Sequence, residues 1–204
     1  MTEDISDQPE QWTVESSQST FSGAVISIRS DTLTSPVDGS RFVRDVVEHP
    51  GAVAVVALDE ANRVLLVRQY RHPVGYRLVE LPAGLRDVQD EPLEQTARRE
   101  LYEEGHVRAS DWRVLADVFS SPGMTDEAVR IFLARGITNV PDGERYEGVH
   151  EEADMDLSWS PLADVVARVL HGSVHNALLC VGILAAWAAQ NGTGFDALRR
   201  PHGS

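Results

Sequence analysis

Residues 84–107 read G-L-R-D-V-Q-D-E-P-L-E-Q-T-A-R-R-E-L-Y-E-E-G-H-V, and most of this stretch has the pattern of an amphipathic helix. Pro92 suits a first helical position, because its φ is already helical and its missing N–H is not needed there. Asp90 and Glu91 precede it, where acidic side chains favour a helix start. Apolar residues at intervals of four predict the buried face of the helix: Leu93, Ala97 and Leu101.

Three glutamates lie close together on this predicted helix: Glu100, Glu103 and Glu104. Glu100 and Glu104 are one turn apart, so their carboxylates repel each other unless a cation lies between them. Oxygen ligands on a rigid element suit Mg²⁺ or Mn²⁺, ions that also bind substrate phosphates. A solvated acidic helix face is the alternative explanation of the same residues.

The same stretch resembles the Nudix box, the catalytic loop and helix of hydrolases that split nucleoside diphosphates linked to another group. The family pattern is G-x5-E-x7-R-E-U-x-E-E-x-G-U, where U is aliphatic, and this chain has G-x6-E-x7-R-E-L-Y-E-E-G-H-V. His106 stands where the family has its second glycine. Because that glycine ends the helix in a left-handed turn, we expect Gly105 to take the turn here.

The flanking residues resemble the ADP-ribose pyrophosphatase branch of the family, over roughly residues 12–190. Residues 67–72 (VRQYRH) and 80–84 (ELPAG) match its RQYR…ELPAG signature, and Pro122 lies where this branch carries a proline. The branch implies hydrolysis of ADP-ribose to AMP and ribose 5-phosphate. One alternative is a pyrophosphatase of another nucleoside diphosphate sugar, such as GDP-mannose or ADP-glucose. A second alternative is a catalytically silent Nudix domain that senses nucleotide sugars.

The resemblance also implies a set of metal ligands. Glu100 and Glu104 are expected to hold Mg²⁺, with Mn²⁺ as the other candidate, together with the main-chain oxygen of Ala83. Glu103 is expected as a secondary ligand, and Glu152 as a further ligand from a late polar loop. All of these donors are oxygen atoms, which matches the preference of hard divalent cations.

Catalytic roles are implied for two further positions. Glu152 or Glu151 is expected to orient or deprotonate the attacking water, with Glu152 preferred. A solvated loop is the alternative role of this glutamate pair. Arg99 is expected to orient the acidic cluster, with Glu103 four residues later as its partner.

Substrate contacts are predicted from several parts of the chain. Arg71 is expected to neutralise a charge of the diphosphate or to form a structural ion pair with Glu80, and both roles can hold. The resemblance implies further contacts within the chain: Glu80, Leu85, Ser121 and Glu127. In this branch an N-terminal β unit exchanges across a homodimer, so its strands would bring additional contacts to the other subunit: Arg44, Asp45 and Glu48. Phe21 or Trp12 is expected to stack on the adenine, with edge-strand charges and core aromatics as the alternative roles.

The chain has 204 residues, of which 32 are acidic and 18 basic, and its formal net charge is −14. Such a charge opposes nucleic-acid or anionic-membrane binding as the main role. The basic residues are all arginine, which excludes lysine-based chemistry, and the single Cys180 excludes disulfides and zinc clusters. Residues 1–10 are acidic, unlike a signal peptide, and the apolar run 177–189 is too short to span a bilayer. A cytoplasmic protein is expected.

Two parts are predicted along the chain. Residues 1–48 are expected to form a disordered tail and a small antiparallel β unit, with a turn at 36–39, that has too few apolar residues for its own core and serves dimerisation. Residues 49–204 are expected to form the hydrolase domain, an α/β/α sandwich with a mixed sheet. Its strands are predicted at 52–58, 64–67, 114–119, 129–134 and 155–159, and its further helices at 161–171 and 175–190. The continuous apolar run 52–58 is typical of a strand that is covered on both faces.

Overall fold

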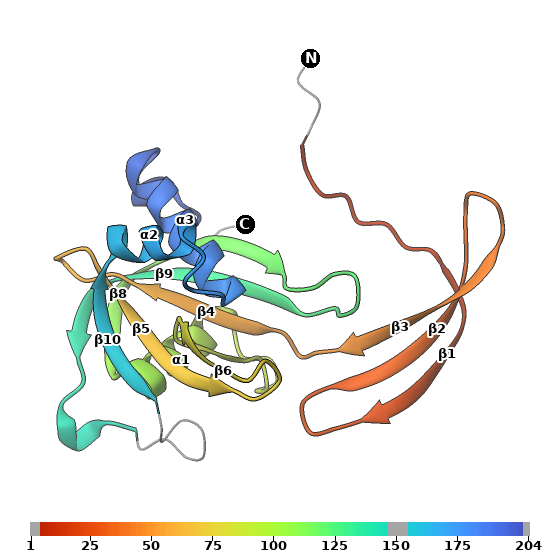
Figure 1. Ribbon diagram of the computed structural model, residues 1–204, viewed down its shortest axis with the longest axis horizontal. Helices are drawn as coiled ribbons and strands as arrows, with labels where there is room; N and C mark the ends of the chain where they lie inside the picture. Colours follow the sequence, from red (N-terminus) through yellow and green to blue (C-terminus); the bar gives the residue numbers. More distant parts are fainter. Residues whose placement is uncertain (1–4, 147–154, 202–204) are drawn as a thin grey trace. The chain divides into compact units, whose positions relative to one another are not determined.

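The computed structural model of the protein describes residues 5–146 and 155–201 (Figure 1). The chain divides into two compact units. The first comprises residues up to 49 together with 121–126, and the second comprises residues 50–120 and those from 127 onward. The association of residues 121–126 with the first unit was not predicted. The dimerisation role of the first unit stays a prediction.

The first unit is a three-stranded antiparallel sheet in the order β1-β2-β3. Its strands are β1 (Thr13–Ser22), β2 (Ser27–Thr34) and β3 (Arg41–Glu48). A turn between β2 and β3 contains Gly39 at a φ of 70°, and the N–H of Ser35 donates to the carbonyl of Ser40 at 2.9 Å. The strand β1 is exposed along its whole length, and the one buried residue of the three strands is the polar Asp31. The sheet therefore has no apolar core of its own, as the composition of the segment predicts.

The second unit is built on two sheets. A mixed sheet has the order β7-β4-β9-β8, in which β4 and β9 are parallel and the other pairs are antiparallel. An antiparallel sheet has the order β10-β5-β6. The strands are β4 (Ala52–Ala57), β5 (Arg63–Arg71), β6 (Tyr76–Glu80), β7 (Ala83–Leu85), β8 (Val107–Phe119), β9 (Ala128–Asn139) and β10 (Asp156–Pro161). The sequence pattern predicted neither β6 nor β7, because β6 shows no alternation of buried and exposed residues and β7 has three residues.

The helices of the second unit are α1 (Leu93–Gly105), α2 (Leu162–Leu170) and α3 (Ala177–Asn191), with short 3-10 turns η1 (Asp142–Glu144) and η3 (Phe195–Ala197). Gly172, at a φ of 66°, lies just beyond the end of α2, and the side chain of Asn176 caps α3 by accepting the N–H of Leu179 at 2.9 Å. Pro92 precedes the first helical residue of α1 with an extended ψ of 138°, so the predicted start is one residue early. No helix in the described part of the chain is long and apolar enough to cross a membrane.

The strand β4 lies at the centre of the core and is buried at every position. Val53 and Val55 belong to one cluster of buried side chains, which includes residues of α1. Ala54 and Val56 belong to a second cluster, which includes residues of α2 and α3. Since successive side chains of a strand point to opposite faces, α1 covers one face of the sheet and α2 with α3 covers the other (Figure 1). The predicted α/β/α sandwich with a mixed sheet is confirmed.

The end of α1 differs from the prediction. Gly105 is the last helical residue, and His106 takes the left-handed conformation with a φ of 52° and a ψ of 32°. A Cβ on Gly105 would lie 2.8 Å from Cδ2 of Leu65, so a side chain here would displace Leu65 where α1 packs on β5. The expectation that Gly105 takes the turn is therefore wrong. The turn stays at position 106, where the family pattern has its glycine.

Candidate active site

The last turn of α1 contacts the beginning of β7. The backbone N–H of Ala83 donates a hydrogen bond of 2.9 Å to Oε2 of Glu104. These residues are 21 positions apart, and the contact arises because β7 pairs with the central strand β4 while α1 packs over that strand. The structure thus brings together two of the predicted metal ligands.

The next residue of β7 lies against a second glutamate. A Cβ on Gly84 would be 2.0 Å from Cδ of Glu100, so only glycine leaves room for this carboxyl group. Glu100 is buried, and burial raises its pKa to about 7 against the opposing effect of Arg99. The carboxylates of Glu103 and Asp87 also raise this pKa, by smaller amounts. The guanidinium of Arg99 thus offsets only part of the effect of burial on the Glu100 carboxyl group.

Arg99 connects several acidic side chains of the site. Its Nη1 lies 2.6 Å from Oε1 of Glu100 and 3.3 Å from Oε2 of Glu103. Its Nη2 lies 3.4 Å from a carboxylate oxygen of Asp87 and 3.4 Å from one of Glu91. The buried Nε of the same guanidinium has no hydrogen-bond partner among the described residues. This arrangement fits the expected orienting role of Arg99 and the expected pairing with Glu103.

Two members of this network, Glu91 and Asp87, were not predicted as site residues. Glu91 was considered only as a residue that favours the helix start, although it is the isolated glutamate of the G-x6-E pattern and could have been assigned from it. Asp87 lies in the loop after β7, and no sequence signal distinguishes it from its neighbours. Both carboxylates help to hold the guanidinium of Arg99 in place.

The donor set at this site suits a hard divalent cation. Glu100, Glu103 and Glu104 offer carboxylate oxygens, and the backbone of Ala83, whose carbonyl is the predicted fourth donor, contacts Glu104 through its N–H. In residues 5–146 and 155–201 no three His, Cys, Asp or Glu side chains are already arranged to hold a metal ion. The glutamates instead bond to protein groups, Glu104 to the N–H of Ala83 and the other two to Arg99. The predicted Glu151 and Glu152 lie outside the described residues.

Arg71 of β5 and Glu80 of β6 form a bidentate ion pair between neighbouring strands. Nε of Arg71 lies 2.9 Å from Oε1 of Glu80, and Nη2 lies 2.7 Å from Oε2. Gln69 adds a longer hydrogen bond of 3.4 Å to the same carboxylate. Glu80 is only 2% exposed, whereas nearly half of the Arg71 side chain is exposed. The expected ion pair is therefore present. Because part of the Arg71 side chain is exposed, it could contact a phosphate group while it stays paired with Glu80.

The candidates on β3 have partners within their own unit. Oδ1 of Asp45 accepts a hydrogen bond of 2.5 Å from Ser30, and Glu48 pairs with Arg29 at 2.6 Å. The guanidinium of Arg44 lies 4.6 Å from the ring centroid of Phe42. Both predicted adenine-stacking residues are exposed, and Trp12 also contacts Phe42 edge-on. These contacts agree with the edge-strand alternative, and the substrate roles stay predictions.

The remaining predicted substrate contacts lie in different places. Leu85 ends β7 opposite Ala52 of β4. The carbonyl of Ser121, in the first unit, accepts the N–H of Met124 at 3.0 Å. The carboxylate of Glu127, in the second unit, accepts a hydrogen bond from the hydroxyl of Ser120. Among the described site residues, the structure brings those of β7 into contact with those of α1, and Arg71 into contact with Glu80.

Comparison with known proteins identifies the family. A model described as the NUDIX domain matches residues 48–178, more than half of the chain. This chain belongs to the Nudix family. An ADP-ribose pyrophosphatase of Mycobacterium tuberculosis is 46% identical over 177 residues, which cover 87% of this chain and 84% of that protein. One of Bacillus subtilis, with the same name, is 34% identical over 157 residues, which cover 77% of this chain and 82% of that protein.

The Nudix fold is also shared with a crystal structure described as that of an ADP compounds hydrolase. The TM-score is 0.76 at 20% sequence identity, and the match covers 93% of this chain and 99% of the other. The Nudix box at residues 84–107 lies inside the matched range and comprises the end of β7, the following loop and α1. The family predicted from the box is confirmed.

Proposed function

We propose that this Nudix protein hydrolyses the pyrophosphate bond of ADP-ribose to AMP and ribose 5-phosphate with the help of a divalent cation. The observation that carries the proposal is the contact between α1 and β7, where Glu100 lies against Gly84 and Glu104 accepts the N–H of Ala83. Two relatives that cover most of the chain and are named ADP-ribose pyrophosphatases support this choice of substrate.

Magnesium is the proposed ion, with Mn²⁺ as a substitute. Glu100, Glu103, Glu104 and the carbonyl of Ala83 would hold it, together with Glu152. When bound, such an ion draws charge from the phosphoryl oxygens and lowers the pKa of water. The chain's own contribution is the placement of these donors, since Arg99 holds Glu100 and Glu103 in fixed positions.

Proton transfer and substrate binding are assigned to other residues. Glu152, or failing it Glu151, would take the proton from the attacking water. Arg71 would neutralise part of the charge of the diphosphate while its pair with Glu80 holds it in place. Leu85, Ser121 and Glu127 would contribute further contacts within the chain.

A homodimer with exchanged N-terminal β units completes the proposal. The exposed strand β1 and the missing apolar core of the first unit support an association with another surface. The exchanged unit would bring Arg44, Asp45 and Glu48 to the substrate of the other subunit. The single cysteine, which leaves no possible disulfide within the chain, favours a cytoplasmic location.

A hydrolysis screen tests the activity. The protein is incubated with Mg²⁺ and ADP-ribose, ADP-glucose or GDP-mannose, and the products are resolved by chromatography. We expect kcat/KM to be about tenfold or more higher for ADP-ribose, about 1.4 kcal/mol of transition-state discrimination, with AMP as product. Preference for another substrate would keep the mechanism and change the specificity. Tight binding of these compounds without hydrolysis of any of them would indicate a nucleotide-sugar sensor instead of an enzyme.

The role of the carboxylates is tested with a matched pair of variants. Glu104→Gln keeps the size of the side chain and an oxygen that can accept the N–H of Ala83, but removes the charge. We expect turnover to fall by about 100-fold or more, with an unchanged far-UV circular dichroism spectrum. Glu60→Gln removes a charge from an exposed turn of the same unit and should retain full turnover. Equal activity of the two variants would contradict metal-assisted hydrolysis at this site.

A further inference from the structure

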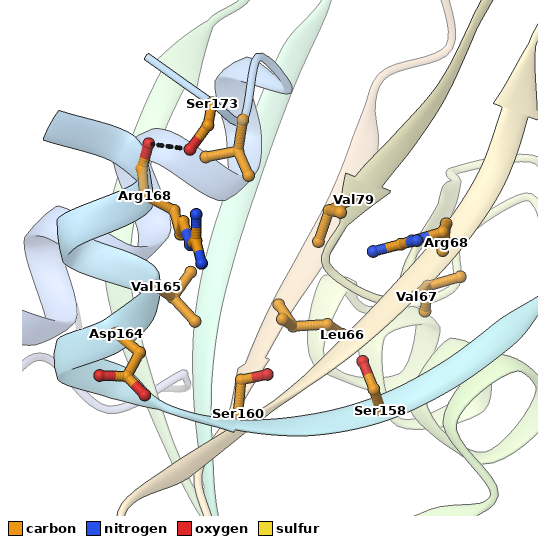
Figure 2. Close-up of a pocket in the computed structure, with 11 residues that line it drawn as sticks. Leu66, Val67, Arg68, Val79, Ser158, Ser160, Asp164, Val165, Arg168 and Ser173 are labelled. Atoms are coloured by element: carbon orange, nitrogen blue, oxygen red, sulfur yellow. Dashed lines mark hydrogen bonds between the residues drawn. The ribbon is translucent and has the colours of Figure 1, made fainter. Parts of the chain in front are cut away.

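The second unit contains a pocket that none of the predicted site residues lines. It has a volume of about 440 Å³ and lies between α2 and the sheet formed by β5, β6 and β10 (Figure 2). Leu66 and Val165 are among the apolar residues of its wall, and the polar residues are two arginines, three serines and Asp164. This size is within the range of small-ligand sites, and the mixture of an apolar wall and a few polar groups is typical of them.

The pocket is on the opposite side of β5 from α1. Leu65 packs in the cluster that contains residues of α1, whereas Leu66 packs in the cluster that contains residues of α2 and α3. Arg68 is two residues after Leu66 and therefore points to the same face of the strand. Arg71, by the same alternation, shares the face of Leu65. The pocket is thus separate from the carboxylates of α1 and from the Arg71–Glu80 pair.

Two guanidinium groups face this pocket from different elements. Arg68 belongs to β5 and Arg168 to α2, and Figure 2 shows both side chains turned toward the space above Leu66. Asp156 is opposite Arg68 in the strand register, and Asp164 is one turn before Arg168. Even so, the described residues provide no side-chain hydrogen bond or ion pair to either guanidinium. Two guanidinium groups without a side-chain partner among residues 5–146 and 155–201, against the one carboxylate of Asp164, favour an anionic ligand in a chain with a net charge of −14.

Three serines contribute hydroxyl groups to the polar lining, beside the two arginines and Asp164. Ser158 and Ser160 alternate along β10 opposite Leu66 and Val64, so both point to the face of β5 that carries Arg68. Ser173 already donates its hydroxyl to the carbonyl of Arg168 at 3.1 Å (Figure 2). A carboxylate has two oxygens and is satisfied by one guanidinium, whereas a phosphate monoester offers three. Donors from three elements therefore match a phosphate group better than a carboxylate.

We propose that this pocket binds the phosphate group of a small phosphomonoester. Arg68 and Arg168 neutralise the dianion, and the hydroxyls of Ser158 and Ser160 donate to its remaining oxygens. The apolar wall around Leu66 covers the carbon part of the ligand. Because binding here needs neither a metal ion nor the carboxylates of α1, it is independent of the proposed hydrolysis.

Calorimetric titration of the full chain tests this site. The buffer contains a chelator and little chloride, so that binding at a metal-dependent site is suppressed, and the probes are ribose 5-phosphate, inorganic phosphate and succinate. The variant Arg68→Gln/Arg168→Gln removes both guanidinium groups, and it should fold normally because neither has a side-chain partner in the described part of the chain. The control Arg200→Gln removes an arginine that is exposed and outside the pocket.

We expect both phosphate probes to bind the wild type and the Arg200→Gln control, and the double variant to bind about tenfold or more weakly at an unchanged melting temperature. The amide resonances of Ser158 and Ser160 should shift on titration in the wild type. Equal binding by the double variant, or no binding by the wild type, would overturn the proposal. Succinate binding as tight as that of phosphate would overturn the assignment to a phosphomonoester.

Discussion

The carboxyl group of Glu100 occupies the space in which a side chain at Gly84 would begin. A Cβ built on Gly84 would be 2.0 Å from Cδ and 2.2 Å from Oε1 of Glu100. Gly84 does not have a left-handed φ, so what this position requires is space. The first glycine of the Nudix box therefore allows β7 to approach the carboxylates of α1.

A methyl group at position 84 should displace the carboxylate. We expect Gly84→Ala to lower kcat/KM for ADP-ribose by about 100-fold, or about 2.7 kcal/mol, while secondary structure is retained. Steady-state kinetics and circular dichroism measure the two effects. Gly143→Ala is the control, because a Cβ there meets no atom within 4 Å. Wild-type activity of Gly84→Ala would show that the position of Glu100 does not matter for turnover.

The pair of Arg71 and Glu80 should separate stability from substrate binding. Glu80→Gln leaves a buried amide beside a guanidinium, and we expect it to lower the free energy of unfolding by about 1–3 kcal/mol. Arg71→Gln should in addition raise KM for ADP-ribose by about tenfold, because it removes a charge from the diphosphate site. Urea denaturation and kinetics of both variants measure this difference. If Arg71→Gln left KM unchanged, the pair would be structural only.

His106 holds a left-handed conformation that favours glycine. His106→Gly removes this strain but adds freedom to the unfolded chain, so we expect stability to change by less than about 1 kcal/mol. His106→Val should be destabilised by about 1–2 kcal/mol, because a β-branched residue tolerates this φ poorly. Urea denaturation compares the three proteins. Turnover that appeared only in His106→Gly would support the sensor instead of the enzyme.

The stability that Asp117 contributes should depend on pH. Its carboxylate accepts hydrogen bonds from Arg130 at 2.6 Å and Arg199 at 2.8 Å, and these bonds lower its pKa although burial opposes them. The charged form is therefore favoured in the folded state. Its contribution is complete above the unfolded pKa of about 4 and is lost as the pH falls through the lower folded value.

Asp117→Asn should thus cost about 0.5–1 kcal/mol at pH 7, a discounted figure because nearly half of the side chain is exposed. The difference from the wild type should shrink as the pH drops below about 4. Urea denaturation at pH 7 and in the acid range checks this. Asp142→Asn, at a highly exposed pair with Arg145, is the control and should show almost no effect at either pH. A constant difference for Asp117→Asn at both pH values would argue against the pKa shift.

Local patterns in the sequence were sufficient for most of the fold. The interval of four between Leu93, Ala97 and Leu101 predicts α1, and the continuous apolar run of β4 predicts a strand covered on both faces. Such patterns predict helices and strands because buried side chains recur along each element with the period of its own backbone. The short β7 has no period to read, and it is recognisable only through its pairing with β4.

The Nudix box likewise predicted which residues form the candidate active site, but it did not predict which of them contact one another. The sequence contains Gly84, Glu100 and Glu104. The two glutamates contact β7, which carries Gly84, only because α1 and β7 both pack on β4. The left-handed turn falls at His106 and not at Gly105, which stays helical and close to Leu65 of a neighbouring strand. Arg68 and Arg168 come to one pocket across a hundred residues of chain. Short-range periodicity specifies each element, but contacts between distant elements form only when those elements pack, because close packing determines which side chains share a space.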